Sequence, residues 1–517
     1  MIRHEDIPHD FNLASWFLDR NVEEGRGDCV ALHGETTVSY RELEALQNRA
    51  GNVLLGLGVR PEDRVLLALS DGPEFVACWY AALKVGAVVA EAYTFLPVKD
   101  YAYYLRYSRA RVVIVDGTTL ANVREAVRGL TRAPAILVVG TETESGETSF
   151  EDAAAAASDA LEAADTGKDD PALWKFTTGS TGAPKAVCHL MHDALISHES
   201  FAVDVVGYTE DDVVLPVPKL FFGYARDAAT LFTFGVGAAG IVFPERSTPE
   251  LLFDLIERHR PTIMVQVPTM MSAMLEHPGA RERDLSSLRL CLSSGEALPQ
   301  EVHRRWLDTY GVEVLEGVGS SELYHIYLSN RPGRPRPGSV GELVPGYQAK
   351  LLDGARQPVP DGEPGELWIS GESAGLCYWG DHERSKHTFH GDTVRTGDLF
   401  VRDTDGFYWY RGRADDLLKV GGIWVAPLEV ENCLLRHPAV AEVAVVGYEE
   451  GGLMLPAAFV VLRDGYETES HELQDFVRAE LSPHKYPREV HFRAELPRTA
   501  SGKVDRKSLA NPPEVRA

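Results

Sequence analysis

The chain has 517 residues, of which 44% are hydrophobic and 25% are charged, and both shares are ordinary for a folded globular protein. Its net charge of −26 argues against nucleic acid or an anionic membrane as a partner. The N-terminus has no apolar signal core and no apolar run approaches the length that spans a bilayer, so the sequence predicts a cytoplasmic protein with no membrane partner.

The N-terminal region alternates short apolar strands with helices. Residues 65–69 are expected to form a buried strand, residues 73–85 an amphipathic helix, and residues 87–90 the next strand. A second pair of strands is expected at 112–115 and 136–139. Such alternation predicts a parallel sheet covered by helices, in a chain long enough for one large domain and a smaller partner.

A segment rich in hydroxyls and glycines follows, between two apolar segments that are typical of strands. It reads Thr-Thr-Gly-Ser-Thr-Gly-Ala-Pro-Lys over residues 177–185. Glycines let backbone N–H groups converge on an anion, while hydroxyls and a lysine add donors and charge. The segment is not a Walker A loop, and a flexible surface turn is the alternative reading. Its setting between apolar strands favours a polyphosphate site formed by Thr177, Thr178, Gly179, Ser180, Thr181, Gly182 and Lys185.

Four further apolar strands are expected in the central part, each ending in small or polar residues before a helix. They cover residues 213–217, 263–268, 288–296 and 312–315. In open α/β sheets, that edge is where ligands bind.

From about residue 338, short strands separated by Gly, Pro and Asp turns predict a β-rich module. From Asp415 onward, about a hundred residues remain, which is enough for a separate small α+β domain.

The six cysteines are scattered, with no paired spacing typical of a zinc site or a disulfide framework. Most stand in apolar settings and are expected to be core residues in a reducing compartment. They are Cys29, Cys78, Cys188, Cys291, Cys377 and Cys433.

Six motifs in this order resemble the superfamily of AMP-forming acyl/aryl-CoA synthetases, adenylation domains and luciferases. They stand at 177–185, 293–298 (Ser-Ser-Gly-Glu-Ala-Leu), 317–322 (Gly-Val-Gly-Ser-Ser-Glu), 395–398 (Arg-Thr-Gly-Asp), 412–416 (Gly-Arg-Ala-Asp-Asp) and 497–503 (Pro-Arg-Thr-Ala-Ser-Gly-Lys). Residues 316–337 and 419–427 are most similar to the benzoate-CoA ligase group. The resemblance implies an α/β fold with a large N-terminal domain over residues 1–412, made of helix-covered sheets and a β-rich module. It also implies a small, mobile α+β C-terminal domain over 413–517, with a hinge near Asp415.

The activity that this resemblance implies is activation of a small aromatic carboxylic acid. ATP and Mg²⁺ would give an enzyme-bound aryl-AMP, and CoA would then take the aryl group as a thioester, with AMP and pyrophosphate released. Two alternatives keep the adenylation machinery: loading of a carrier-protein thiol, or activation of nitrite for diazotisation of an aromatic amine. A third alternative is a catalytically silent nucleotide-binding homologue. Whether the protein forms a homodimer is left open by the sequence.

Four charged residues carry the implied nucleotide chemistry. Lys503 is the expected catalytic lysine that bridges the carboxylate and the α-phosphate, and Glu322 the expected catalytic carboxylate and Mg²⁺ ligand. Asp398 is expected to bind the ribose diol, and Arg413 to assist at ribose or phosphate. Each of these four residues also has a purely structural alternative: in the same order, a solvated loop lysine, a buried ion-paired glutamate, a turn aspartate and a surface arginine.

The remaining nucleotide and CoA positions follow from the same resemblance. Gly295, Glu296, Glu316 and Gly317 are expected to flank the adenine, with Ser321 also in the nucleotide site. Two glycines would line the CoA tunnel, where the ligand approaches backbone closely, and they are Gly421 and Gly422.

The acid site is expected to be an aromatic, partly apolar slot with a lysine for the carboxylate. Its expected members are Phe222, Tyr224, His325, Ile326 and Lys419, although each apolar one could equally be core.

Two stretches depart from the benzoate-CoA ligase pattern. Ala-Arg-Asp-Ala at 225–228 replaces Gly-Leu-Gly-Asn, so Arg226 and Asp227 either pair with each other or bind a ring substituent, and Arg226 is included among the expected substrate contacts. Glu-Ala-Tyr-Thr at 91–94 replaces Pro-Val-Asn-Thr, far from the chemistry as far as the motifs show.

Overall fold

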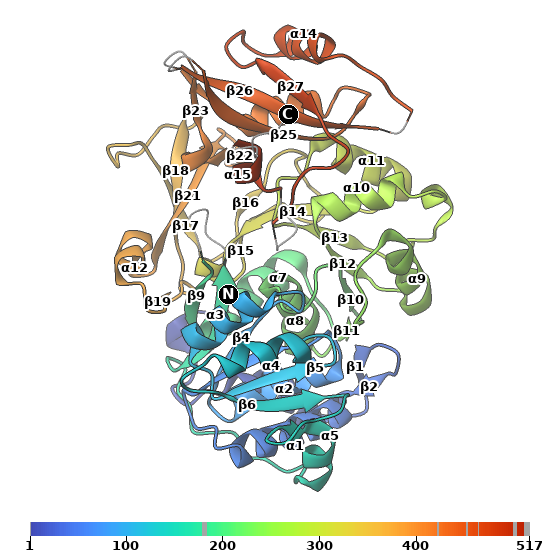
Figure 1. Cartoon of the computed structure of the whole chain (residues 1–517), viewed down its shortest axis with the longest axis vertical. Helices are drawn as coiled ribbons and strands as arrows, with labels where there is room; N and C mark the ends of the chain where they lie inside the picture. The colour runs from blue at the N-terminus through green and yellow to red at the C-terminus, as the bar shows by residue number, and fades with distance from the viewer. Residues whose placement is uncertain are drawn as a thin grey trace.

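The computed structural model describes residues 2–177, 183–420, 423–450, 453–463, 465–499 and 504–510, without the side chains of residues 415, 423, 424 and 453. The chain folds into a large N-terminal domain of mixed helices and sheets and a smaller C-terminal domain (Figure 1). The α/β fold class expected from the sequence is confirmed.

One eight-stranded sheet carries the strands on either side of the expected phosphate loop. Its strands are β3 (Arg64–Ala68), β4 (Val88–Glu91), β5 (Val112–Asp116), β6 (Ala135–Val139), β7 (Thr148–Ser149), β8 (Pro171–Thr177), β9 (Lys185–Leu190) and β19 (Cys377–Tyr378). They lie in the order β19-β9-β8-β4-β3-β5-β6-β7. The run from β8 to β7 is parallel, whereas β9 is antiparallel to both of its neighbours.

Crossover helices connect the parallel strands, as the sequence alternation predicts. They are α2 (Pro73–Lys84), α3 (Val98–Ser108) and α4 (Leu120–Arg128). Helix α2 begins with Pro73, whose fixed φ suits a first turn, and Gly86 follows its end with φ +73°. Residues 75–84 are all buried, so this helix packs inside the protein on every side.

A second, nine-stranded sheet lies in the same domain. Its strands are β1 (Val30–His33), β2 (Val38–Ser39), β10 (Val213–Pro216), β11 (Ala239–Ile241), β12 (Ile263–Gln266), β13 (Leu290–Ser293), β14 (Val314–Gly319), β15 (Ile326–Ser329) and β16 (Glu342–Leu343). The order is β16-β15-β14-β13-β12-β10-β11-β1-β2, parallel from β14 to β1 and antiparallel at both edges.

Further helices of this domain cover or flank the two sheets. They are α1 (Tyr40–Gly56), α5 (Phe150–Ala156), α6 (Met191–Ser197), α7 (Gly223–Arg226), α8 (Phe232–Val236), α9 (Pro249–His259), α10 (Pro268–Glu276) and α11 (Gln300–Tyr310). The main hydrophobic core joins the sheets: Leu67 and Ile114 from one and Val265 and Leu292 from the other belong to one buried cluster with Trp79 of α2. This shared core fixes the two sheets relative to each other.

The β-rich module expected after residue 338 is confirmed as an antiparallel sheet. It contains β17 (Gln348–Leu352), β18 (Pro364–Ser370), β20 (Phe389–His390), β21 (Thr393–Arg402) and β22 (Tyr408–Arg413), with α12 (His382–Thr388) beside it.

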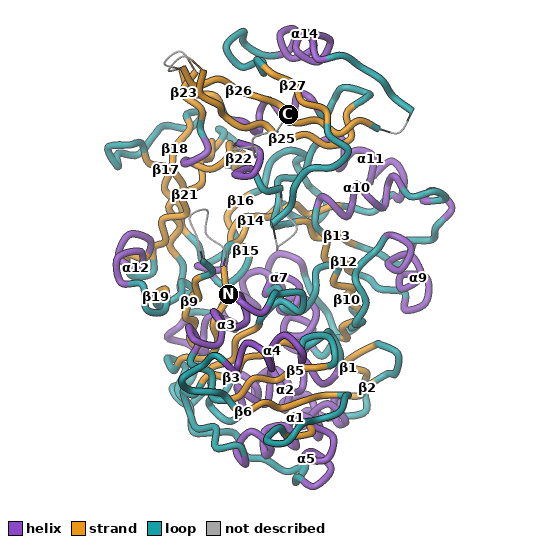
Figure 2. Tube along the Cα trace, in the orientation of Figure 1, coloured by secondary structure: helices purple, strands orange, loops and turns teal. Residues whose placement is uncertain are grey.

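The C-terminal domain has a core of its own. Its elements are β23 (Leu418–Val420), β24 (Ile423–Val425), α13 (Pro427–Leu434), β25 (Val440–Glu450), β26 (Leu453–Leu462), α14 (Ser470–Glu480), β27 (Glu489–Phe492) and α15 (Arg506–Ala510). Figure 2 shows α14 beside the strands β25, β26 and β27. Val430, Val445, Val460 and Leu473 belong to a buried cluster separate from the main core, which agrees with the expected small α+β domain.

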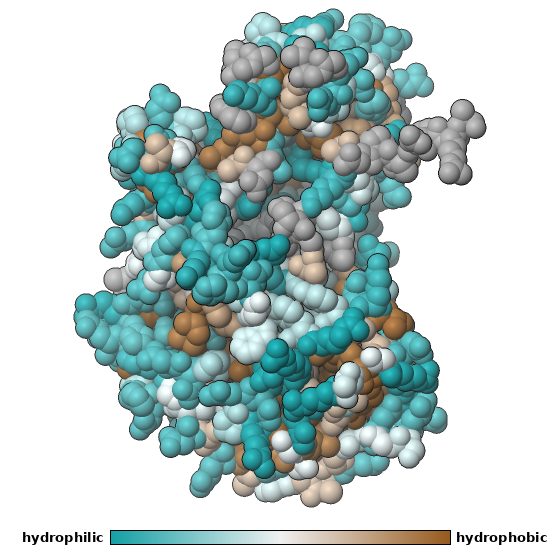
Figure 3. Space-filling view, turned by 60° about the vertical axis from the view of Figure 1, so that its left-hand side comes forward, coloured by the Kyte–Doolittle hydropathy of each residue, from teal (hydrophilic) through white to brown (hydrophobic). Residues whose placement is uncertain are grey.

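The face of the molecule in Figure 3 is mostly hydrophilic, and its apolar atoms occur in separated groups. None of the helices in the described part of the chain combines the length and apolar character that crossing a bilayer requires.

Candidate active site

The two strands that flank the expected phosphate loop lie side by side. β8 and β9 are antiparallel, and Thr177 stands opposite Lys185 where the connecting loop begins and ends. The other five predicted phosphate-binding residues lie outside the described residues: Thr178, Gly179, Ser180, Thr181 and Gly182. The strands therefore bring both ends of the loop to one place, and the loop's role stays a prediction.

Lys185, Glu322 and Tyr378 meet next to this loop. Lys185 Nζ is 3.7 Å from Glu322 Oε1 and 3.6 Å from the centre of the Tyr378 ring. Tyr378 Oη donates a hydrogen bond to Glu322 Oε1 at 2.6 Å. Burial lowers the pKa of Lys185, and the charge of Glu322 opposes that shift. The structure thus joins the predicted phosphate lysine to the predicted magnesium carboxylate, and it adds Tyr378, which the sequence analysis missed.

Glu322 lies in a short 3-10 helix, η7 (Ser321–Leu323), that leads into a strained turn at Tyr324. Tyr324 has φ 70° and ψ −60°, and His325 N donates to Leu323 O at 2.9 Å. These values define the rare γ-turn with positive φ, which a bulky residue keeps only where its surroundings hold it.

Four consecutive carbonyls of this turn each accept a hydrogen bond from another segment. The donors are His189 Nε2 to Ser321 O (2.6 Å), Gly375 N to Glu322 O (2.9 Å), Ser373 Oγ to Leu323 O (3.0 Å) and Lys175 Nζ to Tyr324 O (2.6 Å). Two of these donors come from β8 and β9, so the strands of the phosphate loop also position the Glu322 turn.

Lys175 is a buried charge in the middle of strand β8. Its Nζ donates to Asp227 Oδ2 at 2.5 Å as well as to the Tyr324 carbonyl. Burial lowers the pKa of Lys175 to about 8, although the neighbouring Asp227 carboxylate raises it. The sequence analysis missed Lys175; the available signal was one charged residue inside an otherwise apolar strand.

Arg226 extends this contact into a cluster of four buried charges. Arg226 Nη2 donates to Asp227 Oδ1 at 2.8 Å, and its Nη1 pairs with Glu91. Glu91 also accepts a hydrogen bond from Trp79 Nε1 at 2.6 Å. Because two cations face two carboxylates, the formal charges of Glu91, Lys175, Arg226 and Asp227 cancel.

The structure shows Arg226 paired with Asp227, which is one of its two expected roles, and substrate contact by Arg226 stays a prediction. It also corrects the expectation that residues 91–94 lie far from the site. Glu91 pairs with Arg226, and the Tyr93 ring is 5.0 Å from the ring of Phe222. The two departures from the benzoate-CoA ligase pattern therefore meet in space, which no motif spacing could show.

Two of the predicted acid-site residues, Tyr224 and His325, are in ring contact beside the cluster, and Phe222 and Ile326 are near them in the chain. The ring of His325 is 5.5 Å from that of Tyr224 and 4.7 Å from that of Phe232. Phe222 directly precedes α7, and Ile326 begins β15 directly after His325. Burial lowers the pKa of His325 to about 4, so the ring is neutral.

His325 Nε2 lies 3.2 Å from the Tyr224 carbonyl, which can only accept, so Nε2 carries the proton. His325 Nδ1 and Tyr224 Oη are buried and have no hydrogen-bond partner among the described residues. Buried polar atoms normally have partners, so this pair fits a ligand with polar groups.

Lys419, the predicted carboxylate lysine, lies on β23 of the C-terminal domain and has an exposed side chain. Helix α7, which contains Tyr224 and directly follows Phe222, belongs to the large domain (Figure 1). The four aromatic and apolar members of the predicted acid site are thus on one domain and the lysine is on the other.

Of the predicted adenine residues, Gly295 and Glu296 follow strand β13, whereas Glu316 and Gly317 lie within the neighbouring parallel strand β14, in which Glu316 pairs with Ser293 of β13. Glu296 accepts a hydrogen bond from Thr269 Oγ1 at 2.6 Å. Glu316 Oε1 accepts from Leu298 N at 3.1 Å, and burial raises the pKa of Glu316 to about 8.

Gly295 has φ +88°, a conformation that favours glycine, and a Cβ on Gly317 would come within 3.0 Å of a backbone oxygen. The structure therefore places Gly295, Glu296, Glu316 and Gly317 at the carboxyl ends of adjacent strands, where ligands bind in open α/β sheets.

Asp398 and Arg413 are opposite each other on β21 and β22. Arg413 Nη1 is 3.3 Å from Asp398 Oδ1 and donates to the Thr396 carbonyl at 3.0 Å. The two predicted ribose-site residues are therefore adjacent, on the last strands before the C-terminal domain.

Several predicted residues cannot be placed fully. Lys503, Gly421 and Gly422 lie outside the described residues. Asp415 lies in a 3-10 helix, η8 (Ala414–Asp416), between β22 and β23, where a hinge between the domains was expected; its side chain is not described.

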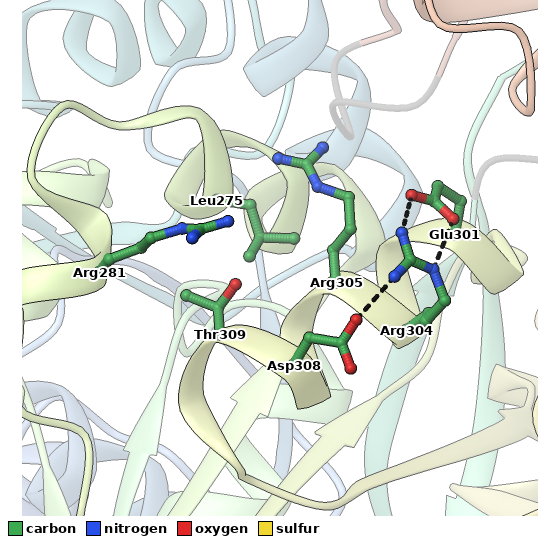
Figure 4. A pocket seen from close by; sticks show the side chains of 7 residues that line it. All are labelled: Leu275, Arg281, Glu301, Arg304, Arg305, Asp308 and Thr309. Carbon is green, nitrogen blue, oxygen red and sulfur yellow. Dashed lines mark hydrogen bonds and ion pairs between the residues drawn. The ribbon is translucent and has the colours of Figure 1, made fainter.

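A cavity of about 230 Å³ lies elsewhere in the large domain, over α10 and α11 (Figure 4). Arg304 in its wall is paired with Glu301 and Asp308 of the same helix, at 2.6 Å each. Arg305 pairs with Glu276, which also pairs with Arg463 of the C-terminal domain at 2.5 Å. This cavity is separate from the Glu322 turn, and its neighbour Glu276 connects the two domains.

Comparisons with known proteins agree with this geometry. A family model described as AMP-binding enzyme matches residues 18–379, and one described as AMP-binding enzyme C-terminal domain matches residues 429–503. A benzoate–CoA ligase of Thauera aromatica is 40% identical over 97% of this chain and 96% of its own. A solved anthranilate CoA ligase in complex with anthranoyl-AMP is similar with a TM-score of 0.95 and 37% identity over 98% of both chains. A benzoate CoA ligase of Burkholderia xenovorans LB400 is similar with a TM-score of 0.90 and 39% identity over 97% of this chain and 100% of the other.

Proposed function

Because the chain belongs to the AMP-binding enzyme family, with relatives named as benzoate-CoA ligases, we propose that it is an AMP-forming aryl-CoA ligase. It uses ATP to convert a small aromatic carboxylic acid into an enzyme-bound aryl-AMP and passes the aryl group to CoA. The observation that carries this proposal is the similarity over 98% of the chain to a solved ligase that holds its aryl adenylate.

In the first half-reaction, a carboxylate oxygen of the acid attacks the α-phosphorus of ATP, and pyrophosphate leaves. Negative charge on the phosphate oxygens must be neutralised, which is the main work in phosphoryl-type transfer. Lys185 lies at the end of the phosphate loop and supplies one such charge, and Lys503 supplies another at the α-phosphate and the carboxylate.

Glu322 fits the role of magnesium ligand. Its side chain is an oxygen donor at 16% exposure, and Tyr378 Oη fixes one of its two carboxylate oxygens. A hard cation prefers such a carboxylate together with substrate phosphates. When bound there, Mg²⁺ supplies positive charge to the phosphates. Glu322 and its clamped turn hold the ligand oxygen in place.

The aryl ring packs against the rings of Phe222, Tyr224 and His325, which offer faces and edges for aromatic contacts, and against the aliphatic side chain of Ile326. The free Nδ1 of His325 and Oη of Tyr224 supply polar contacts. Lys419 binds the acid carboxylate when the C-terminal domain brings β23 to the site.

In the second half-reaction, the CoA sulfur attacks the carbonyl carbon of the aryl-AMP, and AMP leaves. The domain boundary after residue 412, with a hinge at Asp415, lets the C-terminal domain exchange Lys503 for the glycines Gly421 and Gly422. Asp398 holds the ribose diol throughout, oriented by Arg413. A cytoplasmic location and a homodimeric assembly stay predictions.

The test is AMP formation with Mg-ATP and a panel of benzoic, hydroxybenzoic, aminobenzoic and cinnamic acids, each with and without CoA. We expect one class of aromatic acid to give an aryl-CoA identified by mass. AMP release without any thioester would redirect the proposal to a carrier-protein thiol or nitrite. No acid-dependent AMP at all would leave nitrite activation, which is tested by adding nitrite to the same assay, or a silent nucleotide-binding homologue.

A further inference from the structure

Two cysteines far apart in sequence stand opposite each other in the eight-stranded sheet. Cys188 of β9 and Cys377 of β19 are register partners in an antiparallel pair of strands, and both are free thiols. Opposed residues in such strands have Cα atoms roughly 4.5–5.5 Å apart. A disulfide spans Cα separations of about 4.4–6.8 Å, so the backbone already meets its requirement.

The chemistry of the two thiols is asymmetric. Cys188 is buried with 4% exposure, whereas Cys377 is half-buried. A hydrogen bond from the Cys188 thiol lowers the pKa of Cys377 to about 7, and the same contact raises the pKa of Cys188. Cys377 is therefore the accessible thiol with thiolate character, which is the attacking form, and Cys188 stands next to it as a second thiol.

The pair is directly connected to the candidate active site. Tyr378 follows Cys377 in β19, and its Oη donates to Glu322 Oε1 at 2.6 Å. The ring of Tyr378 also lies under Lys185 Nζ, at 3.6 Å, and Lys185 begins the strand that holds Cys188. A covalent link between the two strands would thus act on the elements that hold Tyr378 and Lys185.

We propose that Cys188 and Cys377 are a redox-sensitive pair that a peroxide converts into a disulfide, and that this disulfide lowers the adenylation activity. The Cys377 thiolate attacks one oxygen of hydrogen peroxide, the O–O bond breaks, and, after protonation, one water and a sulfenic acid result. The Cys188 sulfur then attacks the Cys377 sulfur, its proton goes to the departing hydroxide, and a second water leaves. Two thiols are oxidised and one peroxide is reduced to two waters, and a dithiol reductant reverses the step.

The spacing of the six cysteines in the sequence gave no sign of this pair, because only the pairing of β9 with β19 brings them together. Formation of the disulfide does not depend on the proposed ligase activity, whereas the effect on activity does. The two parts are therefore measured separately.

The test treats the full-length protein with hydrogen peroxide, maps its peptides by mass without reduction, and measures acid-dependent AMP formation before and after a dithiol reductant. We expect a Cys188–Cys377 cross-linked peptide and a reversible loss of activity of about tenfold or more, because displacements near 1 Å at reacting groups lower rates by up to about 100-fold. Cys377→Ser is expected to keep its basal activity and lose the reversible inhibition. Cys29→Ser, which removes an exposed cysteine, should behave as the wild type.

Three results would overturn the proposal: no cross-linked peptide, a cross-linked peptide with unchanged AMP formation, or the same reversible inhibition in Cys377→Ser. Cys188→Ser is the second variant, checked for folding by thermal unfolding. If it does not fold, Cys377→Ser alone decides, because that side chain is partly exposed. If no acid gives AMP even in the untreated protein, the peptide map still tests the disulfide, and the proposed function fails on its own.

Discussion

Glu91, Lys175, Arg226 and Asp227 have side chains that are at most 5% exposed, and their formal charges cancel. Removing ions from water costs several kcal/mol each, so such a group persists only when each member has a partner. Lys175 has a further role, because its ammonium group holds the carbonyl of the strained Tyr324. The cluster therefore connects the core to the turn that carries Glu322.

Lys175→Met should leave an uncompensated buried carboxylate and lower the free energy of unfolding by about 3 kcal/mol. The double variant Lys175→Met/Asp227→Asn restores charge balance and should recover most of that loss. In both variants we expect a higher KM for the aromatic acid than in the wild type, because the carbonyl of Tyr324 has lost its donor, Lys175 Nζ. Denaturant unfolding and steady-state kinetics measure the two effects. Recovery of both stability and KM in the double variant would show that Lys175 only balances charge.

Glu316 is expected to make the free energy of unfolding depend on pH, and the direction of that dependence follows from its pKa. Burial raises its pKa to about 8, above the roughly 4.3 of an unfolded chain. The stability it contributes is therefore full below about pH 4.3 and is lost as the pH rises through about 8.

Glu316→Gln keeps the oxygen that accepts from Leu298 N but cannot ionise. We expect the variant to exceed the wild type in free energy of unfolding by roughly 2–4 kcal/mol at pH 9, and to match it at pH 4. Thermal unfolding from pH 4 to 9 measures this. Parallel pH profiles for the two proteins would contradict the assignment of a buried, protonated Glu316.

Among the elements, the turn from Ser321 to His325 is the most constrained part of the site. Its γ-turn stores about 1–3 kcal/mol of strain, and four donors from other segments hold it. Preorganised groups of this kind keep a ligand oxygen in place before the substrate arrives. Tyr378 completes the arrangement from β19.

Tyr378→Phe removes the hydroxyl that donates to Glu322 Oε1 and keeps the ring beneath Lys185. We expect the rate of aryl-AMP formation to fall about tenfold, with a change in the free energy of unfolding near 1 kcal/mol. The matched control is Tyr101→Phe, which also removes a buried hydroxyl donor, to the carbonyl of Tyr93. Equal rate losses in both variants would show that the effect is a general one on folding.

Elements with a regular pattern were predictable, and contacts between them were not. Strands β3 to β6 and helix α2 follow from apolar runs in the sequence, so their parallel pairing was expected, whereas the order of the strands in the sheet was not. The cluster of Lys175 with Glu91 and Arg226 joins three segments with no common spacing, so only the fold reveals it. The same holds for Tyr378, which a two-residue strand brings to Glu322, and for the opposed Cys188 and Cys377.

The two domains have separate hydrophobic cores, and an ion pair joins one domain to the other. Arg463 of the C-terminal domain pairs with Glu276 of α10, which also pairs with Arg305 of α11. This arrangement of the chain is similar to that of a ligase structure holding anthranoyl-AMP, at a TM-score of 0.95. The ion pair therefore favours the arrangement of the two domains described here.

Glu276→Gln should weaken that arrangement by less than about 1 kcal/mol, because the pair is partly exposed. We expect the distance distribution between fluorophores on the two domains, measured with Mg-ATP and acid bound, to broaden, while the melting temperature stays unchanged. Glu301→Gln breaks a comparable pair within α11 and is the control. An unchanged distribution in Glu276→Gln would mean that other contacts set the domain arrangement.

An aryl-CoA ligase forms an aryl-AMP and then transfers its aryl group to CoA on the same protein. The most direct measurement mixes excess enzyme with Mg-ATP and the preferred acid, quenches the reaction, and identifies enzyme-bound species by mass before and after a CoA chase. We expect an aryl-AMP that is converted into aryl-CoA and AMP during the chase. We also expect Lys503→Ala to form no aryl-AMP yet still to convert supplied aryl-AMP into the thioester. An aryl-AMP that CoA does not consume, or normal formation of aryl-AMP in Lys503→Ala, would show that the protein is not a ligase of this kind.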